Sequence, residues 1–123
     1  MKLTIEVRED EYFLKLLSFL HALPPFNKLT KQELYTLAAL LELNYKYRKV
    51  PFIERNKLLF GTRSRKRVTE MVGMNYNNLY NLIQRLRKKG FVEKYEDEDT
   101  LVLNPKYALK KTASLTILFE DNE

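Results

Sequence analysis

Residues 62–91 constrain the fold more than any other part of this sequence, because two apolar ladders at helical spacing are separated by one glycine and closed by another. Thr62 or Ser64 provides the N-cap of a short first helix, and Gly73 ends that helix. A second helix runs to about residue 89, with Gly90 as its C-terminal cap. This order is typical of a helix-turn-helix unit. The residues expected to point inward are Val68, Met71, Val72, Leu79, Leu82, Ile83 and Leu86.

Two runs of residues that favour strands, FVEKY and TLVLN, follow the second helix directly. They are separated by the acidic residues 96–99, EDED, and the second run ends at Pro105. Proline cannot donate to a strand ladder, so it marks the end of the second strand. The pattern predicts a β-hairpin in the position that a wing takes after a recognition helix.

Upstream of this unit, residues 31–45 carry the pattern of a long amphipathic helix. Thr30 and Glu33 have the spacing of a capping box, in which each side chain bonds the free backbone N–H of the other residue. Residues 51–61 begin with a proline and end with a glycine. Their pattern fits either a short helix or a buried connector.

Each end of the chain carries the alternation of a half-buried strand. Leu3, Ile5 and Val7 alternate with polar residues over residues 2–8. Over residues 115–120, the apolar residues 115, 117 and 119 alternate with Thr116, Leu118 and Glu120. We expect the two strands to pair, either within one chain or across a homodimer or higher oligomer. Between the first strand and the rest of the chain, an apolar helix is stopped by the double proline at residues 24–25.

The order helix, helix-turn-helix and hairpin, with LRKKGF at the junction, resembles the winged-helix DNA-binding domain over residues 31–105. The stretch LIQRLRKKGFVEKYEDEDTLVLNPKY is similar to the C-terminal part of RepL-type plasmid replication proteins and of small phage-encoded winged-helix proteins. The resemblance implies a phage- or plasmid-encoded protein that binds double-stranded DNA in transcription regulation or replication initiation. Winged helices also serve as protein-docking modules, so the fold by itself does not decide the function.

The length of 123 residues, 45% of them hydrophobic, corresponds to one domain. We expect a mostly helical α+β fold, a winged helix-turn-helix with a β-hairpin wing and short N- and C-terminal strands. Its parts are an N-terminal strand and helix at residues 1–25, a winged-helix core at residues 30–105 and a C-terminal strand and tail at residues 106–123.

Basic charge is concentrated in residues 46–89, which hold 13 of the 22 basic residues and two of the 16 acidic ones. A phosphate-facing surface has this footprint, although a solvated Lys and Arg face has it as well. The resemblance places a recognition helix, about residues 76–89, in the major groove, where Asn pairs with adenine and Arg with guanine. The expected base contacts are Asn77, Asn78, Asn81 and Arg85. The expected DNA backbone contacts are Arg63, Arg65, Lys66, Arg67, Tyr76, Gln84, Arg87, Lys88 and Lys89.

Asparagine is a poor helix former, so several asparagines in one helix require a cap role or a contact role. Asn75 fits an N-cap. Asn78 and Asn81 fit a base contact, a phosphate contact or a plain polar surface. Tyr76 and Tyr80 fit either a DNA contact or packing on the shoulder of the helix.

The acidic tip of the expected wing, residues 96–99, argues against a simple DNA-binding surface, because phosphates repel it. Either this tip points away from the duplex or it docks onto a basic surface of a protein partner. A second hypothesis therefore stands: a winged-helix protein-interaction or structural module of a phage particle or replication assembly, with no sequence-specific DNA reading.

Catalysis has little support in the sequence. His21 is the sole histidine, there is no cysteine, and the three glycines do not form a phosphate-binding loop. We expect no enzyme activity, catalytic residue, metal site or cofactor. The longest mostly apolar segment, residues 12–23, is too short to cross a bilayer, and no export signal opens the chain. We expect a cytoplasmic protein, or a virion-associated one if a phage encodes it.

Overall fold

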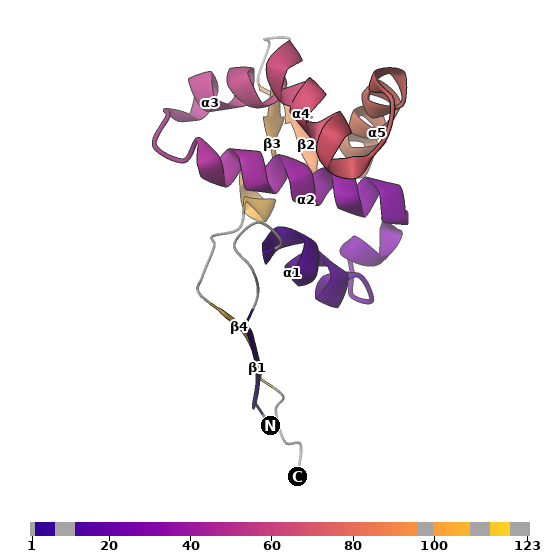
Figure 1. The fold of residues 1–123 in the computed structure, drawn as a ribbon, viewed down its shortest axis with the longest axis vertical. Coiled ribbons are helices and arrows are strands. Elements are labelled where there is room, and N and C mark those ends of the chain that lie inside the picture. Colours follow the sequence, from indigo (N-terminus) through magenta and orange to yellow (C-terminus); the bar gives the residue numbers. More distant parts are fainter. Residues whose placement is uncertain (1, 7–11, 96–99, 109–113, 119–123) are drawn as a thin grey trace.

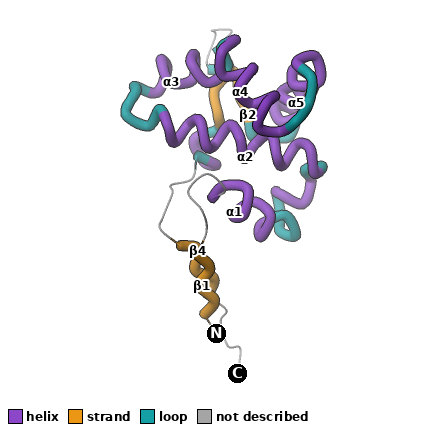
Figure 2. The backbone as a smooth tube through the Cα atoms, in the orientation of Figure 1, coloured by secondary structure: helices purple, strands orange, loops and turns teal. Residues whose placement is uncertain are grey.

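The computed structural model describes residues 2–6, 12–95, 100–108 and 114–118 (Figure 1). Within these ranges the protein is a mostly helical α+β structure with two antiparallel sheets of two strands each. The helices form one body, and β1 and β4 project from it as a pair (Figure 2). The elements are β1 Lys2–Glu6, α1 Tyr12–Leu20, the short 3₁₀ helix η2 Phe26–Lys28, α2 Lys31–Lys46, α3 Phe52–Leu59, α4 Thr62–Val72, α5 Tyr76–Lys88, β2 Val92–Lys94, β3 Leu101–Leu103, η3 Pro105–Tyr107 and β4 Ser114–Leu118.

Helix α2 lies at the centre of the helical body, and the other four described helices pack on it (Figure 1). The predicted capping box at its start is confirmed. Thr30 Oγ1 accepts the N–H of Glu33 at 3.2 Å, and Glu33 Oε1 accepts the N–H of Thr30 at 2.8 Å. Behind this cap, Leu34, Leu37 and Leu41 are at most 2% exposed, so α2 supplies the middle of the core.

Helix α1 ends before the double proline, as predicted. Phe13 and Leu17 are fully buried, and α1 lies against α2. Nε2 of His21 lies 2.8 Å from the carbonyl oxygen of Leu29, a hydrogen bond that ties the end of α1 to the chain entering α2. His21 therefore has a structural contact in this part of the molecule.

The segment that fitted either a helix or a connector is the helix α3. Its inner face carries a buried amide, Asn56, which is 1% exposed. Asn56 Nδ2 donates to the carbonyl of Phe52 at 2.8 Å, and Oδ1 accepts the N–H of Leu103 at 2.9 Å. Because Leu103 belongs to β3, this bond fastens the β2–β3 hairpin to α3.

Helices α4 and α5 follow one another through a turn in which Gly73 has a φ of 76°, which confirms the predicted glycine stop. The predicted N-cap of α4 is wrong. Gly61 is the N-cap, because its backbone is already extended, and no side chain caps it. Thr62 is the first helical residue, and Ser64 is buried inside the helix beside the core.

One residue of the predicted inner face of α4 points elsewhere. Val68 is fully buried and Val72 is partly buried, as predicted, but Met71 is 41% exposed. Ser64, Val68 and Val72 follow each other at four-residue intervals and form the inner stripe of α4. Met71 lies to the side of that stripe, where a groove opens toward α1 and α2.

Strands β2 and β3 form the predicted hairpin, with Val92 opposite Leu103 and Lys94 opposite Leu101. Phe91, Val92 and Leu103 are at most 2% exposed, so the base of the hairpin belongs to the core. The acidic tip, residues 96–99, lies outside the described residues.

Strands β1 and β4 pair with each other in antiparallel register, Lys2 opposite Leu118 and Glu6 opposite Ser114. The two chain ends were expected to pair, either within one chain or between chains, and the structure pairs them within one chain. Val7 and residues 119–120, also expected in these strands, lie outside the described residues.

Candidate nucleic-acid interface

Helix α5 has one buried face and one exposed face. Leu79, Leu82, Ile83 and Leu86 are at most 3% exposed, which confirms the predicted inward side. The four residues expected to contact bases all lie on the exposed side, while Gln84 and Arg87 are half-buried at its edge. The exposed residues of α5 are Tyr76, Asn77, Asn78, Tyr80, Asn81, Arg85 and Lys88.

Three of these residues form a row along the helix. Asn77, Asn81 and Arg85 are spaced four residues apart, so their side chains follow each other on one stripe of α5. The row spans about 12 Å at the rise of an α-helix, a length close to the width of the DNA major groove. Their side chains make no hydrogen bond to any other described residue, so these donors and acceptors face solvent.

At the N-terminal end of α5, Leu79 packs in the core and the cap is a local side-chain bond. Oδ1 of Asn75 accepts the N–H of Asn78 at 2.9 Å, which confirms the cap role of Asn75. Asn78 uses only its backbone in this bond, and its side-chain amide remains exposed. Tyr76 and Tyr80 are 42% and 56% exposed, so the structure shows neither as a buried packing residue.

The C-terminal end of α5 is instead fixed by several groups. Gly90, with a φ of 87°, lets the chain reverse so that the N–H of Phe91 donates to the carbonyl of Leu86 at 2.9 Å, the bond of a Schellman motif. Asn104 Nδ2 then donates to the carbonyl of Gly90 at 2.9 Å, and the N–H of Asn104 donates to the carbonyl of Phe91 at 3.0 Å. Through these two bonds, Asn104, directly after β3, is joined to residues 90 and 91, directly after α5.

Lys89, expected at the DNA backbone, has protein partners instead. Its Nζ lies 2.6 Å from Oε1 of Glu33 and 2.8 Å from the carbonyl oxygen of Lys28. The side chain of Glu33 is 0% exposed and that of Lys89 is 30% exposed. The ion pair therefore joins the end of α5 to the start of α2, and Lys89 serves this contact within the protein.

Glu33 has an unusual environment for a carboxylate. Burial by itself raises its pKa, but the hydrogen bonds from Lys89 and Thr30 and the positive charge of Lys89 outweigh burial. The pKa of Glu33 is consequently lowered from its ordinary value of 4.5, and this carboxylate stays charged inside the protein.

A second group of basic residues surrounds a cleft between α2 and α4. This cleft, called the basic cleft below, has a volume of about 350 Å³ and no α5 residue in its lining. Lys46 and Tyr47 come from the end of α2, and Glu70 is the sole carboxylate among the described residues that line it. The other charged residues of the lining are Arg63, Lys66 and Arg67 of α4.

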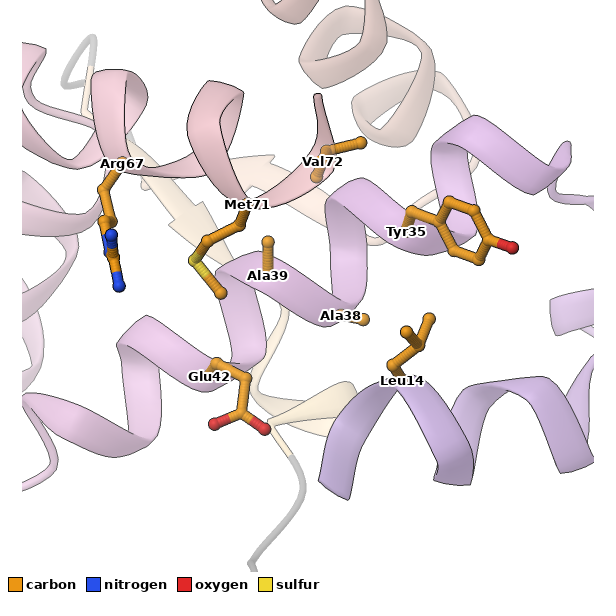
Figure 3. Close-up of a pocket in the computed structure, with 8 residues that line it drawn as sticks. All are labelled: Leu14, Tyr35, Ala38, Ala39, Glu42, Arg67, Met71 and Val72. Atoms are coloured by element: carbon orange, nitrogen blue, oxygen red, sulfur yellow. The ribbon is translucent and has the colours of Figure 1, made fainter. Parts of the chain in front are cut away.

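A second concave region, a groove of about 520 Å³, lies between α1, α2 and α4 (Figure 3). Leu14 of α1 and Met71 of α4 are 37% and 41% exposed and lie at its sides. Ala38 and Ala39 of α2 form its floor, where their small side chains leave space. The groove is mostly apolar, in contrast to the exposed face of α5.

Arg65, another expected backbone contact of α4, is half-buried and does not line the basic cleft. Within the described part of the chain, no group of three or more His, Asp or Glu side chains is arranged to hold a metal ion. Over the same residues, no helix combines the length and apolar character that crossing a membrane requires.

Comparisons of the chain with protein-family models, curated proteins and solved structures found no match.

Proposed function

We propose that this chain is a winged-helix protein that binds double-stranded DNA with α5 as its recognition helix in the major groove. The proposal is carried by the two faces of α5. Its apolar face is buried, whereas Asn77, Asn81 and Arg85 form an exposed row with no partner among the described residues. A helix that served only to cover the core would gain stability from better helix formers at the asparagine positions.

The chemistry of the row suits base edges. An Asn amide forms two hydrogen bonds with the N6 and N7 positions of adenine, and an Arg guanidinium forms two with O6 and N7 of guanine. Asn77, Asn78, Asn81 and Arg85 are the proposed base contacts. The proposed contacts of α5 to the sugar-phosphate backbone are Tyr76, Gln84, Arg87 and Lys88, which flank this row.

The proposed process is transcription regulation or replication initiation, in a protein encoded by a phage or plasmid. Both processes require a protein that finds one defined DNA site. The support is the resemblance of residues 31–105 to winged-helix domains, together with the observed order of α4, the Gly73 turn, α5 and the β2–β3 hairpin.

Fluorescence anisotropy tests the proposal with labelled duplexes, one chosen by selection from a random pool and one with the same composition in scrambled order. The titration is repeated at about 50 and 200 mM salt, a range over which phosphate contacts weaken strongly. If about six phosphates are neutralised, the logarithm of affinity falls with the logarithm of salt with a slope near −5. Binding with such a slope and a preference for the selected duplex supports the proposal.

The matched variants are Asn81→Ala in α5 and Gln32→Ala in α2, which both remove an exposed amide. Asn81→Ala is expected to reduce the preference for the selected duplex, and Gln32→Ala to leave it unchanged. Equal behaviour of the two variants on both duplexes would refute the assignment of α5 as the reading helix.

The second candidate function is a protein-interaction module of a phage particle or replication assembly. The observation that favours it is the run of four carboxylates in residues 96–99, which suits a basic protein surface and opposes phosphates. This function predicts that Asn78→Ala and Asn81→Ala preserve activity in the assembly. It also predicts that replacing residues 96–99 by Ser and Gly abolishes that activity.

A further inference from the structure

We propose that the basic cleft between the end of α2 and the first turns of α4 is a second site for DNA phosphate, separate from the surface of α5. The inference rests on the proposed function, because it assumes that the chain binds DNA. Arg63, Lys66 and Arg67 were expected from the sequence to meet the DNA backbone, and the structure places Lys46 from the end of α2 in the lining of the same cleft.

Charge is the first support for the site. Lys46, Arg63, Lys66 and Arg67 converge on one concave region from two helices, and Glu70 is its sole described carboxylate. A concave surface lined by one sign of charge concentrates its field and attracts counter-ions more strongly than the same charges on a flat surface. The basic cleft therefore favours an anion over water.

The partners already present in the cleft are weak. Nη1 of Arg67 lies 3.4 Å from Oε2 of Glu70, and these side chains are 62% and 68% exposed. An exposed pair of this kind contributes little stability, so a phosphate can replace the carboxylate at small cost. Among the described residues, Arg63 and Lys66 have no ion-pair partner, and Lys46 has only the ring of Tyr47, 5.6 Å from its Nζ to the ring centroid.

The start of α4 lies at one edge of the cleft and has no side-chain cap. Helices α2 and α5 begin with side-chain caps, Thr30 and Asn75, whereas Gly61 offers none to α4. No acidic residue occupies the first turn of α4, and Arg63 and Ser64 of that turn line the cleft. Unpaired N–H groups and the positive end of the helix dipole both attract an anion.

Two sources of phosphate fit this chemistry. One is the flank of the duplex that α5 reads, beyond the base pairs in contact with α5. The other is a second duplex, which the chain would bridge to the first. Both present phosphodiester groups to the same cations, so duplex length and stoichiometry distinguish them.

The test uses the full chain and a double variant, Lys46→Gln with Lys66→Gln. Its matched control, Lys15→Gln with Lys28→Gln, removes two exposed lysines of α1 and η2 that do not line the cleft. Affinity is measured by anisotropy over about 50–200 mM salt on a duplex of roughly 10 base pairs, one helical turn, and on one of roughly 30 base pairs. Circular dichroism confirms that every variant is folded.

The cleft variant is expected to lower the steepness of the salt dependence by about 1 to 2 and to keep the preference for the selected sequence. A change on the long duplex alone, at one duplex per chain, identifies flanking phosphates. Loss of a second bound duplex identifies bridging. An unchanged slope, or an equal change in the control variant, overturns the inference while the assignment of α5 stands. No binding by the wild-type chain at either salt overturns both.

Discussion

The two ends of α5 are held in opposite ways. At its N-terminal end, the one side-chain cap comes from Asn75, and the exposed side chains of Asn77 and Asn81 have no hydrogen-bond partner among the described residues. At its C-terminal end, Gly90, Asn104 and the pair Lys89–Glu33 attach the helix to β3 and α2. Among the described residues, the N-terminal end has no side-chain hydrogen bond to another helix or strand, and it is called the free end below. The C-terminal end is called the anchored end.

If α5 reads DNA as proposed, this difference separates the residues that stabilise the helix from those that bind. The buried and paired groups at the anchored end contribute to folding, so changes there alter the free energy of unfolding. Ala is a better helix former than the exposed asparagines at the free end, so their replacement is expected to keep or slightly raise stability, and any effect on the proposed DNA binding would be separate from folding. A protein that reads DNA with α5 must keep both properties in 13 residues.

The largest effect is expected at the anchored end. Lys89→Ala leaves the fully buried carboxylate of Glu33 without its charged partner, which destabilises the fold by about 2 to 4 kcal/mol. Urea unfolding followed by circular dichroism measures this loss. Lys88→Ala, an exposed neighbour, serves as the control and is expected to change stability by less than about 0.5 kcal/mol. Similar losses in both variants would show that the pair is not an anchor.

At the free end, Asn81→Ala is expected to cost about 1 to 3 kcal/mol of discrimination between the selected and scrambled duplexes. Its free energy of unfolding is expected to stay equal or to rise slightly, because Ala is the better helix former. Anisotropy and urea unfolding of the same sample measure the two quantities. A loss of stability without a loss of discrimination would contradict the division of α5 into a reading end and an anchored end.

A smaller effect is expected for Asn104→Ala, which removes two side-chain hydrogen bonds: the one to the carbonyl of Gly90, a partly buried group, and the one in which Asn104 Oδ1 accepts the N–H of Lys106. The expected destabilisation is about 1 kcal/mol. The control, Asn27→Ala, removes an exposed amide that has no hydrogen bond to the described residues and is expected to be neutral. Urea unfolding measures the midpoints of the two variants. A midpoint lowered in Asn104→Ala alone supports Asn104 as an anchor of α5, and equal midpoints would show that it only ends the strand.

The smallest effect is expected from pH. Because the folded-state pKa of Glu33 lies below its ordinary value of 4.5, the charged carboxylate stabilises the fold above that value. This stabilisation is lost as the pH falls through the folded-state pKa. We expect the urea midpoint of the wild-type chain to fall below pH 4.5 more steeply than that of Glu33→Gln. Parallel pH profiles would show that Glu33 is not the group responsible.

Sequence reasoning succeeded where the signal was local. The capping box of Thr30 and Glu33, the Asn75 cap and the stop at Gly73 all depend on residues within a few positions of each other. The inner face of α5 was equally accessible, because helical periodicity determines it.

The missed contacts join residues far apart in sequence. Lys89 and Glu33 are 56 residues apart, and Asn56 and Leu103 are 47 apart. Residue spacing does not predict which helix ends meet in the fold. The contact of Lys89 with Glu33 was therefore not expected, and Lys89 was placed among the DNA backbone contacts. The N-cap of α4 was missed for a different reason. Serine and threonine are preferred N-cap residues, but the extended backbone lies at Gly61, and Thr62 is already helical.

The pairing of β1 with β4 determines how the protein responds to mechanical load. Lys2 and Leu118 form the outer end of the ladder, and Glu6 and Ser114 form the inner end. A force that separates residues 2 and 118 acts along the hydrogen bonds between the strands, because antiparallel hydrogen bonds lie perpendicular to the strands. Such a force breaks the residue pairs one after another, beginning at the outer end. Under such a force we expect the strand pair to open before α5 is loaded, because the pair lies between the pulled residues and the helical body (Figure 1).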